Sequence, residues 1–442
     1  MLEWMILGAF SAALLLCVVL HRSIIYALCF GFCMFFLYGR HRGFRWRELG
    51  RMTLNGIKAV GGLLVINGLI GILTAFWRAA GTIPVMVCYA SKLIRPSVFL
   101  LMTFLLNGGV GILTGTTFGT AATMGVICAT MGTAMQISPI LTGGAVLSGV
   151  YFADRWSPVS ASVLVISSVT KTDIYRNSRN LLRTGLGPFA LSCIIYLVIG
   201  FLMPRADGTI HLESLFSTVF RLHWTALIPA AMILLLSLCR IRIQIVMLAS
   251  ALSAVPLCLF LQHIPASELL QIAIYGFYPD HPEVAAMVGG GGMISMAALA
   301  AIVCLASCSS ELLRNTGLLD HPQKMIRTME QNTESFAATL MTAVAAGLIA
   351  CNQTLTIFLV NQLCSDRVPD KEQFAVDLED SAAVIAALVP WSIAGSVPLS
   401  FVGAPICSLL VSFFLILVPL WRLAMIQIEK RQKTETKPAT PA

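Results

Sequence analysis

Apolar segments separated by short polar loops run along the whole chain. Most of them approach the roughly 20 residues that a helix needs to cross the hydrocarbon core of a bilayer. The segments lie near residues 2–20, 23–38, 54–77, 97–113, 120–134, 139–168, 184–203, 223–239, 243–261, 285–311, 334–363, 375–395 and 397–421. This pattern predicts an all-α polytopic membrane protein.

Composition supports the same class. The 442 residues are 57% hydrophobic and 11% charged, with a mean hydropathy of +0.84, which excludes an ordinary soluble domain. The 13 cysteines occur singly in apolar segments, which favours small buried side chains over disulfides or zinc ligands. The net charge of +8 comes from short loops beside apolar runs, so we expect a lipid bilayer as partner, no nucleic acid and no cofactor. A homodimer is left open.

Basic loops give the orientation, because loops rich in Lys and Arg face the cytoplasm. Here they are Arg40 to Arg51, Lys171 to Arg183, Arg240 with Arg242, Arg314 to Arg327, and the tail from Arg422 to Lys437. All of them fall on one side only if residues 97–134 and 334–363 form re-entrant hairpins that turn back inside the membrane. The sequence therefore predicts about ten transmembrane helices, two hairpins and cytoplasmic termini.

The same threading predicts an internal repeat of opposite orientation. Residues 1–203 contain three spans, the hairpin 97–134, a broken helix at 139–168 and a final span. Residues 223–427 follow the same order with the hairpin 334–363 and a broken helix at 375–395; residues 204–222 link the halves, and 428–442 form a cytoplasmic tail. Inverted repeats of this kind hold a substrate site between their halves near the midplane. Chance similarity of helices is the alternative, since the match rests on element order and charge.

Asp154 is the leading candidate for chemistry, because it lies inside a predicted span beside the helix-breaking Pro158. An ionisable group at bilayer depth is costly and marks a functional site, where a carboxylate can take up either a cation or a proton. Arg155 could instead pair with Asp154 or hold a substrate carboxylate in a bidentate contact. Adjacent helical residues point in different directions, which disfavours the direct pair.

Further polar groups lie where the chain is expected to open. Backbone and hydroxyl oxygens there suit a small cation such as sodium. The first half supplies Thr114, Thr116, Thr117 and Ser157, and the second half supplies Asn352, Gln353, Glu379, Asp380, Ser381, Trp391 and Ser392. The structural alternatives are close helix packing for Gly115 and Gly119, and capping of a helix N-terminus for Glu379 and Asp380. The run Gly289 to Gly292 is interpreted as a flexible start of a span.

These motifs resemble the NhaC-type sodium/proton antiporters of the ion transporter superfamily. The likeness is carried by Gly81 to Pro84, Lys92 to Pro96, Thr114 to Ala121, Ser148 to Ser160, Leu378 to Ser381 and Leu388 to Ser392. It implies a secondary antiporter with inverted repeats that exchanges sodium, or another monovalent cation, for protons across the cell membrane. In that mechanism Asp154 binds cation or proton with help from Thr116, Thr117, Ser157 and Asn352.

The chain departs from the family pattern where ions would bind. Ala161 to Leu164 replace D-T-T-N, Cys351 to Gln353 replace G-D-Q, and Ile385 to Ala387 replace T-S-P. Since two carboxylates are lost while Arg155 is present, exchange of small organic carboxylates coupled to protons or sodium is the alternative function. No nucleophile and base pattern occurs in a suitable context, so an enzyme is not predicted; a membrane enzyme or non-transporting subunit is the third hypothesis.

Overall fold

The computed structural model describes residues 2–435 apart from 21, 94, 158–159, 204–215, 240, 319–334, 366–367 and 369. Pro158, most of the predicted linker and residues 436–442 of the predicted tail therefore lie outside the described residues. Within the described ranges the regular structure is helical, and the β-structure amounts to one isolated bridge between Phe277 and Gly290. The predicted all-α polytopic membrane class is confirmed.

The first half begins with three long helical segments and continues through shorter, interrupted ones. Its helices are α1 (Leu2–Val19), α2 (Ile24–His41), α3 (Trp46–Ala59), α4 (Gly61–Ala79), α5 (Thr82–Leu93), α6 (Pro96–Thr114), α7 (Thr117–Thr120), the π-helix η1 (Ala121–Gly125), α8 (Val126–Ala134), α9 (Pro139–Trp156), α10 (Ala161–Thr170) and α11 (Ile174–Leu202).

The second half follows a similar course, with extra short helices after its second span. Its helices are η2 (Trp224–Leu227), α13 (Ile228–Leu238), α14 (Ile243–Pro256), η3 (Leu257–Leu261), α15 (Ala266–Tyr275), α16 (Pro282–Val288), η4 (Met293–Met296), α17 (Ala297–Asn315), α19 (Ser335–Ala350), α20 (Gln353–Cys364), α21 (Lys371–Leu378), the π-helix η7 (Glu379–Ala383), α22 (Val384–Leu388), α23 (Ile393–Phe401), η8 (Ile406–Val411) and α24 (Phe413–Glu435).

Six described helical segments are long and apolar enough to cross a membrane by themselves. They are Ile24–His41, Gly61–Ala79, Pro96–Thr114, Arg176–Leu202, Ile243–Leu261 and Met293–Asn315. A seventh is the pair Lys371–Leu388 and Ile393–Phe401, which is bent by 57°. Further apolar helices, such as Phe336–Ala350 and Phe413–Ile428, are shorter. Length alone thus identifies fewer spans than the predicted ten, and one of the six, Pro96–Thr114, belongs to the predicted hairpin 97–134.

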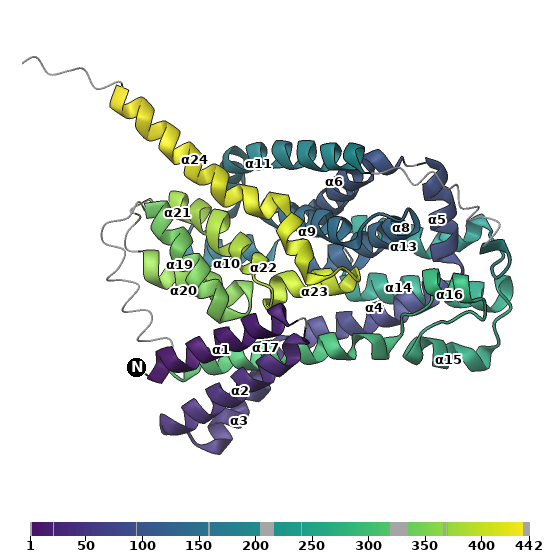
Figure 1. The fold of residues 1–442 in the computed structure, drawn as a ribbon, viewed down its shortest axis with the longest axis horizontal. Coiled ribbons are helices and arrows are strands. Elements are labelled where there is room, and N and C mark those ends of the chain that lie inside the picture. Colours follow the sequence, from purple (N-terminus) through teal and green to yellow (C-terminus); the bar gives the residue numbers. More distant parts are fainter. Residues whose placement is uncertain are drawn as a thin grey trace, which may run out of the picture.

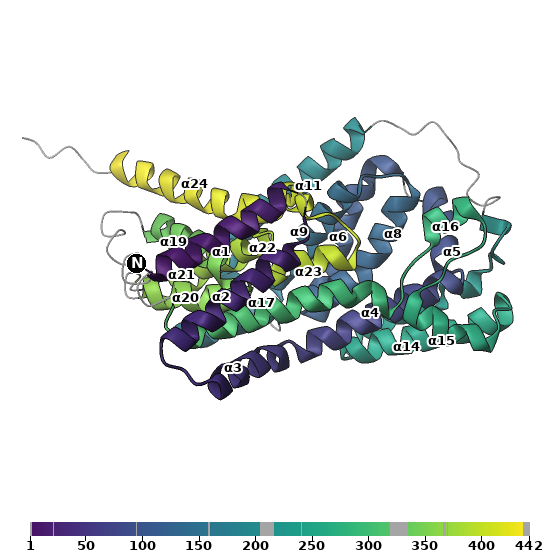
Figure 2. The same ribbon diagram turned by 60° about the horizontal axis from the view of Figure 1, so that its bottom comes forward.

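Most helices run along the long axis of the molecule (Figure 1). The N-terminus, α21 and the end of α24 lie toward one end, and α5, α15 and α16 lie at the other, as the turned view in Figure 2 also shows. The turn between α2 and α3, which carries the basic residues Arg42 and Arg45, is at the same end as the N-terminus.

Both predicted hairpin tips have the same local geometry. Gly115 ends α6 with φ +66°, and the Thr116 hydroxyl then accepts the Gly119 N–H at 2.8 Å to start α7. Cys351 follows α19 with φ +58°, and the Asn352 side chain accepts the Leu355 N–H at 2.8 Å to start α20. A left-handed residue followed by an N-cap lets one helix stop and the next begin with its first N–H groups satisfied.

The two broken helices open where the sequence predicted. α9 ends at Trp156, and α10 starts after Ser160, whose hydroxyl accepts the Val163 N–H at 3.4 Å. α22 ends at Leu388, and α23 starts after Ser392. Pro390 lies in this second gap and has no N–H to continue a helix. The assignment of the halves to an inverted repeat stays a prediction.

Glycines allow α6 and α9 to approach closely, which fixes the end of α9. A Cβ on Gly149 would lie 2.6 Å from the Phe104 carbonyl oxygen, and one on Gly111 would lie 2.4 Å from the Ala153 Cβ. Small residues at such crossings are the usual means of packing membrane helices. Phe152 stacks on Phe189 of α11 at a centroid distance of 4.5 Å and so extends this contact. Asp154 therefore projects from a closely packed helix crossing.

Candidate functional site

Asp154 is buried at the C-terminal end of α9, with only 4% of its surface exposed. Its Oδ1 accepts the Ser160 hydroxyl at 2.9 Å, and its Oδ2 faces the Gln353 Nε2 at 3.5 Å. The hydroxyls of Thr117 and Ser162 also lie beside the carboxylate. Asp154 is thus surrounded by neutral polar groups from the first hairpin, the first helix break and the second hairpin.

Arg155 faces a different partner from its neighbour in sequence. Its guanidinium forms an ion pair with Asp380 of η7, and its Nη2 donates to the Thr184 hydroxyl at 2.5 Å. Thr184 in turn donates to Asp380 at 3.3 Å. Arg155 and Asp380 are both almost completely buried. The described residues contain no ion pair between Asp154 and Arg155, in agreement with the helical spacing.

Glu379 and Asp380 lie well inside a helix. The helix begins at Lys371 after the Asp370 N-cap, and the two acids follow about two turns later in the π-helical turn Glu379–Ala383. The interpretation that they cap a helix N-terminus is therefore wrong. The π-helical turn places both acids on the buried side, and such turns recur at functional sites. Glu379 Oε1 is buried without a hydrogen-bond partner in the described structure.

A second buried ion pair joins α21 to the last helix. Arg422 of α24 contacts Asp377 Oδ1 through its Nη2 at 3.1 Å and its Nε at 3.3 Å, and the Nε lies 3.9 Å from Asp380 Oδ2. Gln373 donates to the same Asp377 oxygen at 2.9 Å. Sequence reasoning missed this pair because Arg422 was assigned to the basic tail. The spacing of three residues between Asp377 and Asp380 was the available signal, since it puts both acids on one helix face.

Two of the acids in this region have no cationic partner. Asp377 pairs with Arg422 and Asp380 pairs with Arg155, whereas Asp154 and Glu379 form no ion pair among the described residues. Glu379 lies within electrostatic range of both Asp154 and Arg155. Isolated buried carboxylates are costly unless a proton or a cation neutralises them. The two unpaired acids are therefore the groups that a proton or a cation would neutralise.

The other predicted site residues support the backbone around this pair of acids. Their hydrogen bonds join Thr114 to Thr120 at 2.8 Å, Ser157 to the Ile112 carbonyl at 3.1 Å, Asn352 to Ser310 at 2.9 Å, Ser381 to the Asp377 carbonyl at 2.5 Å, and Trp391 to the Leu348 carbonyl at 2.9 Å. Thr116 and Ser392 serve as N-caps of α7 and α23. Thr117 and Gln353 are the predicted polar residues that lie beside Asp154.

Ser160, Ser162 and Thr184 complete the surroundings of the charged groups, and sequence reasoning did not select them. Ser160 donates to Asp154 and lies 3.0 Å from the Ser162 hydroxyl. Ser162 occupies a position where the related family carries a different polar residue, which hid its role. Thr184 is the first residue of the predicted span 184–203, and nothing else in the sequence distinguishes it.

A polytopic helical protein with interrupted helices around buried, unpaired carboxylates has the architecture of a secondary transporter. The sequence matches the Na+/H+ antiporter family over residues 2–168 and 149–426. The chain therefore belongs to this family, which makes it a multi-pass membrane transporter of a small ion.

Curated relatives cover most of the chain. It is 26% identical over 403 residues to the Malate-2H(+)/Na(+)-lactate antiporter of Bacillus subtilis (strain 168), covering 88% of this chain and 85% of the relative. It is 25% identical over 398 residues to the Na(+)/H(+) antiporter NhaC of Alkalihalophilus pseudofirmus, covering 87% and 85%. An uncharacterized Na(+)/H(+) antiporter of Haemophilus influenzae is 30% identical over 357 residues, covering 75% of each chain.

Proposed function

We propose that this protein exchanges sodium for protons across the cell membrane, and that Asp154 and Glu379 are the groups for which the two ions compete. The family and the NhaC relatives support the exchange reaction. The assignment of Asp154 and Glu379 rests on which buried acids are paired with an arginine and which are not. The two arginines of the region neutralise Asp377 and Asp380, so Asp154 and Glu379 are left to an ion from outside the protein.

Asp154 has the ligands that a small alkali cation needs. The Ser160 hydroxyl already donates to one carboxylate oxygen, and the hydroxyls of Thr117 and Ser162 add neutral oxygens around it. Gln353 faces the same carboxylate through its amide nitrogen. Broken helices supply such oxygens because their unwound backbone is not used in helical hydrogen bonds. When sodium leaves, protonation of the same carboxylates removes the charge that would otherwise stay buried. Because either sodium or protons must compensate the negative charge of these carboxylates, the movement of sodium is coupled to the movement of protons.

The proposal keeps the predicted threading, with both termini in the cytoplasm and inverted repeats that meet at the acid site. Asp154 comes from the first half, and Glu379 comes from the second. Rocking of one half against the other would expose the shared site alternately to each side. The position of the acids across the two halves supports this arrangement.

Fluorescence dequenching in everted vesicles tests the assignment. Asp154→Asn and Glu379→Gln should each abolish sodium-driven proton movement, because an amide cannot exchange a proton for a cation. The exposed Glu268 of α15 provides a matched control, and Glu268→Gln should behave as wild type. Full exchange by Asp154→Asn at wild-type expression would remove Asp154 from the mechanism, and absence of any cation response in wild type would remove the exchange itself.

Exchange of organic carboxylates is the second candidate, supported by the relative named as a malate and lactate antiporter. An anchoring role for Arg155 in that reaction is not favoured by the contacts, because its guanidinium is buried against Asp380 and Thr184. The Arg155 Nε and Nη1 have no hydrogen-bond partner among the described residues, but both are buried, so a carboxylate at these atoms would have to enter the protein interior beside Asp380. If organic acids bind this protein, another cationic residue is the better candidate.

A further inference from the structure

We infer that the cavity beside Arg78 is a binding site for a small organic carboxylate, separate from the acid site. The cavity has a volume of about 410 Å³. It lies between α4, α8, the loop before η4 and the end of α23. Its lining includes neither Asp154 nor Glu379, and Arg78 is the one charged residue among the described residues that form it. This inference does not depend on the proposed sodium/proton exchange.

The lining matches the chemistry of a small carboxylic acid that carries a hydroxyl group. Hydroxyl groups come from three sides: Thr74 on α4, Thr130 and Thr133 on α8, and Ser295 and Ser400 at the far wall. A guanidinium fits a carboxylate through two parallel hydrogen bonds. The five hydroxyls already donate to backbone carbonyls of the protein, so they present acceptor oxygens to a hydroxyl group of the ligand. A cavity of this volume has room for an acid of a few carbon atoms together with water.

Arg78 is held in place without being neutralised. It is half-buried at the end of α4, and its Nη1 donates to the Gly289 carbonyl oxygen. Its Nε is buried and has no hydrogen-bond partner among the described residues. No described carboxylate pairs with it. A carbonyl oxygen orients the guanidinium but leaves its full positive charge available, which is the state expected of an anion-binding arginine.

The four-glycine run, Gly289 to Gly292, explains how Arg78 is positioned. The last three of these glycines have positive φ angles, and the loop packs directly on α4. A Cβ on Gly291 would lie 2.7 Å from the Ala75 backbone nitrogen, and the Gly292 N–H donates to the Gly71 carbonyl at 2.8 Å. Side chains at these positions would push the loop away from the arginine. The run is therefore a tight backbone support and not only a flexible start of a span.

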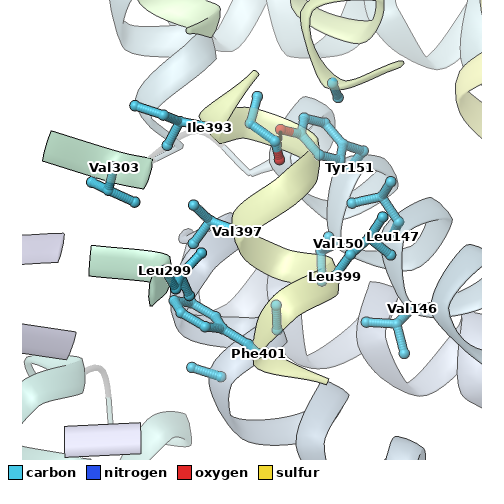
Figure 3. Close-up of a cluster of buried hydrophobic side chains, with 14 of the residues drawn as sticks. Val146, Leu147, Val150, Tyr151, Leu299, Val303, Ile393, Val397, Leu399 and Phe401 are labelled. Carbon is cyan, nitrogen blue, oxygen red and sulfur yellow. Dashed lines mark hydrogen bonds between the residues drawn. The ribbon is translucent and has the colours of Figure 1, made fainter. Parts of the chain in front are cut away.

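A cluster of buried hydrophobic side chains packs around α23, between the cavity and the second hairpin tip. Figure 3 shows Val397 and Phe401 of α23 facing Leu299 and Val303 of α17, with Tyr151 of α9 on the other side. Ile393 at the start of α23 bonds the second hairpin tip at Cys351, whereas Phe401 at its end lines the cavity. Asp154 is not among the residues that line the cavity.

The lining of the cavity includes Ile83 of α5 and Val288 of α16. These two helices lie at one end of the molecule (Figure 1). On the predicted threading this end faces the outside of the cell, since Arg78 follows the third span. A carboxylate would therefore reach Arg78 from the outer side.

A thermal-shift titration of the purified protein in detergent tests the site, with L-malate, L-lactate and succinate as probes and chloride as the inorganic control. At least one organic acid should raise the melting temperature of wild type, whereas chloride should not. Loss of a charged hydrogen-bonding partner weakens binding by about tenfold or more, so Arg78→Gln should shift the half-maximal concentration by at least that factor. Arg78→Lys should recover part of the affinity.

Arg221 supplies the matched control, because it is exposed, lies on the same predicted side and does not line the cavity. Arg221→Gln should titrate as wild type. An unchanged response of Arg78→Gln, or no response of wild type to any of the three acids, would overturn the inference. If Arg78→Gln fails to fold, Thr130→Val decides: a weakened response supports the site, and an unchanged one refutes it. Sodium-driven proton flux is measured separately, without any organic acid. A failure of the proposed sodium/proton exchange can therefore be distinguished from a failure of the carboxylate site.

Discussion

Breaking the buried ion pair between Arg155 and Asp380 gives the sharpest test of the charge distribution at the site. Removal of one member of a buried pair leaves an uncompensated charge and costs about 3–5 kcal/mol. Arg422 lies 3.9 Å from Asp380 and can take over part of the compensation when Arg155 is lost. We therefore expect Arg155→Gln to lower the free energy of unfolding by an amount near the lower end of this range.

The double variant Arg155→Gln with Asp380→Asn removes both charges together. Two amides can hydrogen-bond to each other and to Thr184, so most of the loss should be recovered. The coupling energy of the double-mutant cycle should then reach about 2 kcal/mol or more, within the range measured for contacting residues. Unfolding by sodium dodecyl sulfate in mixed micelles, followed by circular dichroism, measures all three variants against wild type.

The surface pair Arg176 and Glu372 is the control for this cycle. Its atoms approach to 2.9 Å, but the two side chains are 70% and 31% exposed. Exposed pairs of this kind contribute about 0.2–1 kcal/mol. A coupling energy as small as that of the surface pair would mean that Asp380 does not depend on Arg155 for its charge compensation. That result would refute the reasoning that leaves Asp154 and Glu379 unpaired.

Three further predictions concern the hairpins. Gly115→Ala should destabilise the protein by about 1–2 kcal/mol because an L-residue resists the left-handed conformation, whereas Gly109→Ala, which meets no atom within 4 Å, should be neutral or stabilising in the same micelle assay. Asn352→Ala should cost about 0.5–2 kcal/mol through loss of an N-cap, and a null effect on unfolding would contradict that role. In a cysteine-free background, Gln136→Cys should react with an impermeant maleimide only from outside and Ser365→Cys only from the cytosol; the reverse pattern for either would exclude the re-entrant hairpins.

The helical membrane class and the positions of the chain breaks could be read from the sequence because they depend on local properties. Apolar length gives the spans, and proline, glycine and N-cap residues end and restart helices wherever they occur. Thus Gly115, Ser160, Pro390 and Ser392 lie at the interruptions that the sequence predicted. The prediction of Asp154 as a site residue also rested on local evidence, since a carboxylate in an apolar span is conspicuous in any fold, and it stays a prediction.

The partners of the charged residues depended on the tertiary structure. Arg155 is adjacent to Asp154 in sequence but pairs with Asp380, which is more than two hundred residues away, and Arg422 joins Asp377 across the second half. The same is true of Arg78 and its support by Gly289. Sequence determines which residues carry charge and where helices stop. Only the packing of distant helices decides which charges neutralise each other, because electrostatic energy depends on separation in space and not along the chain.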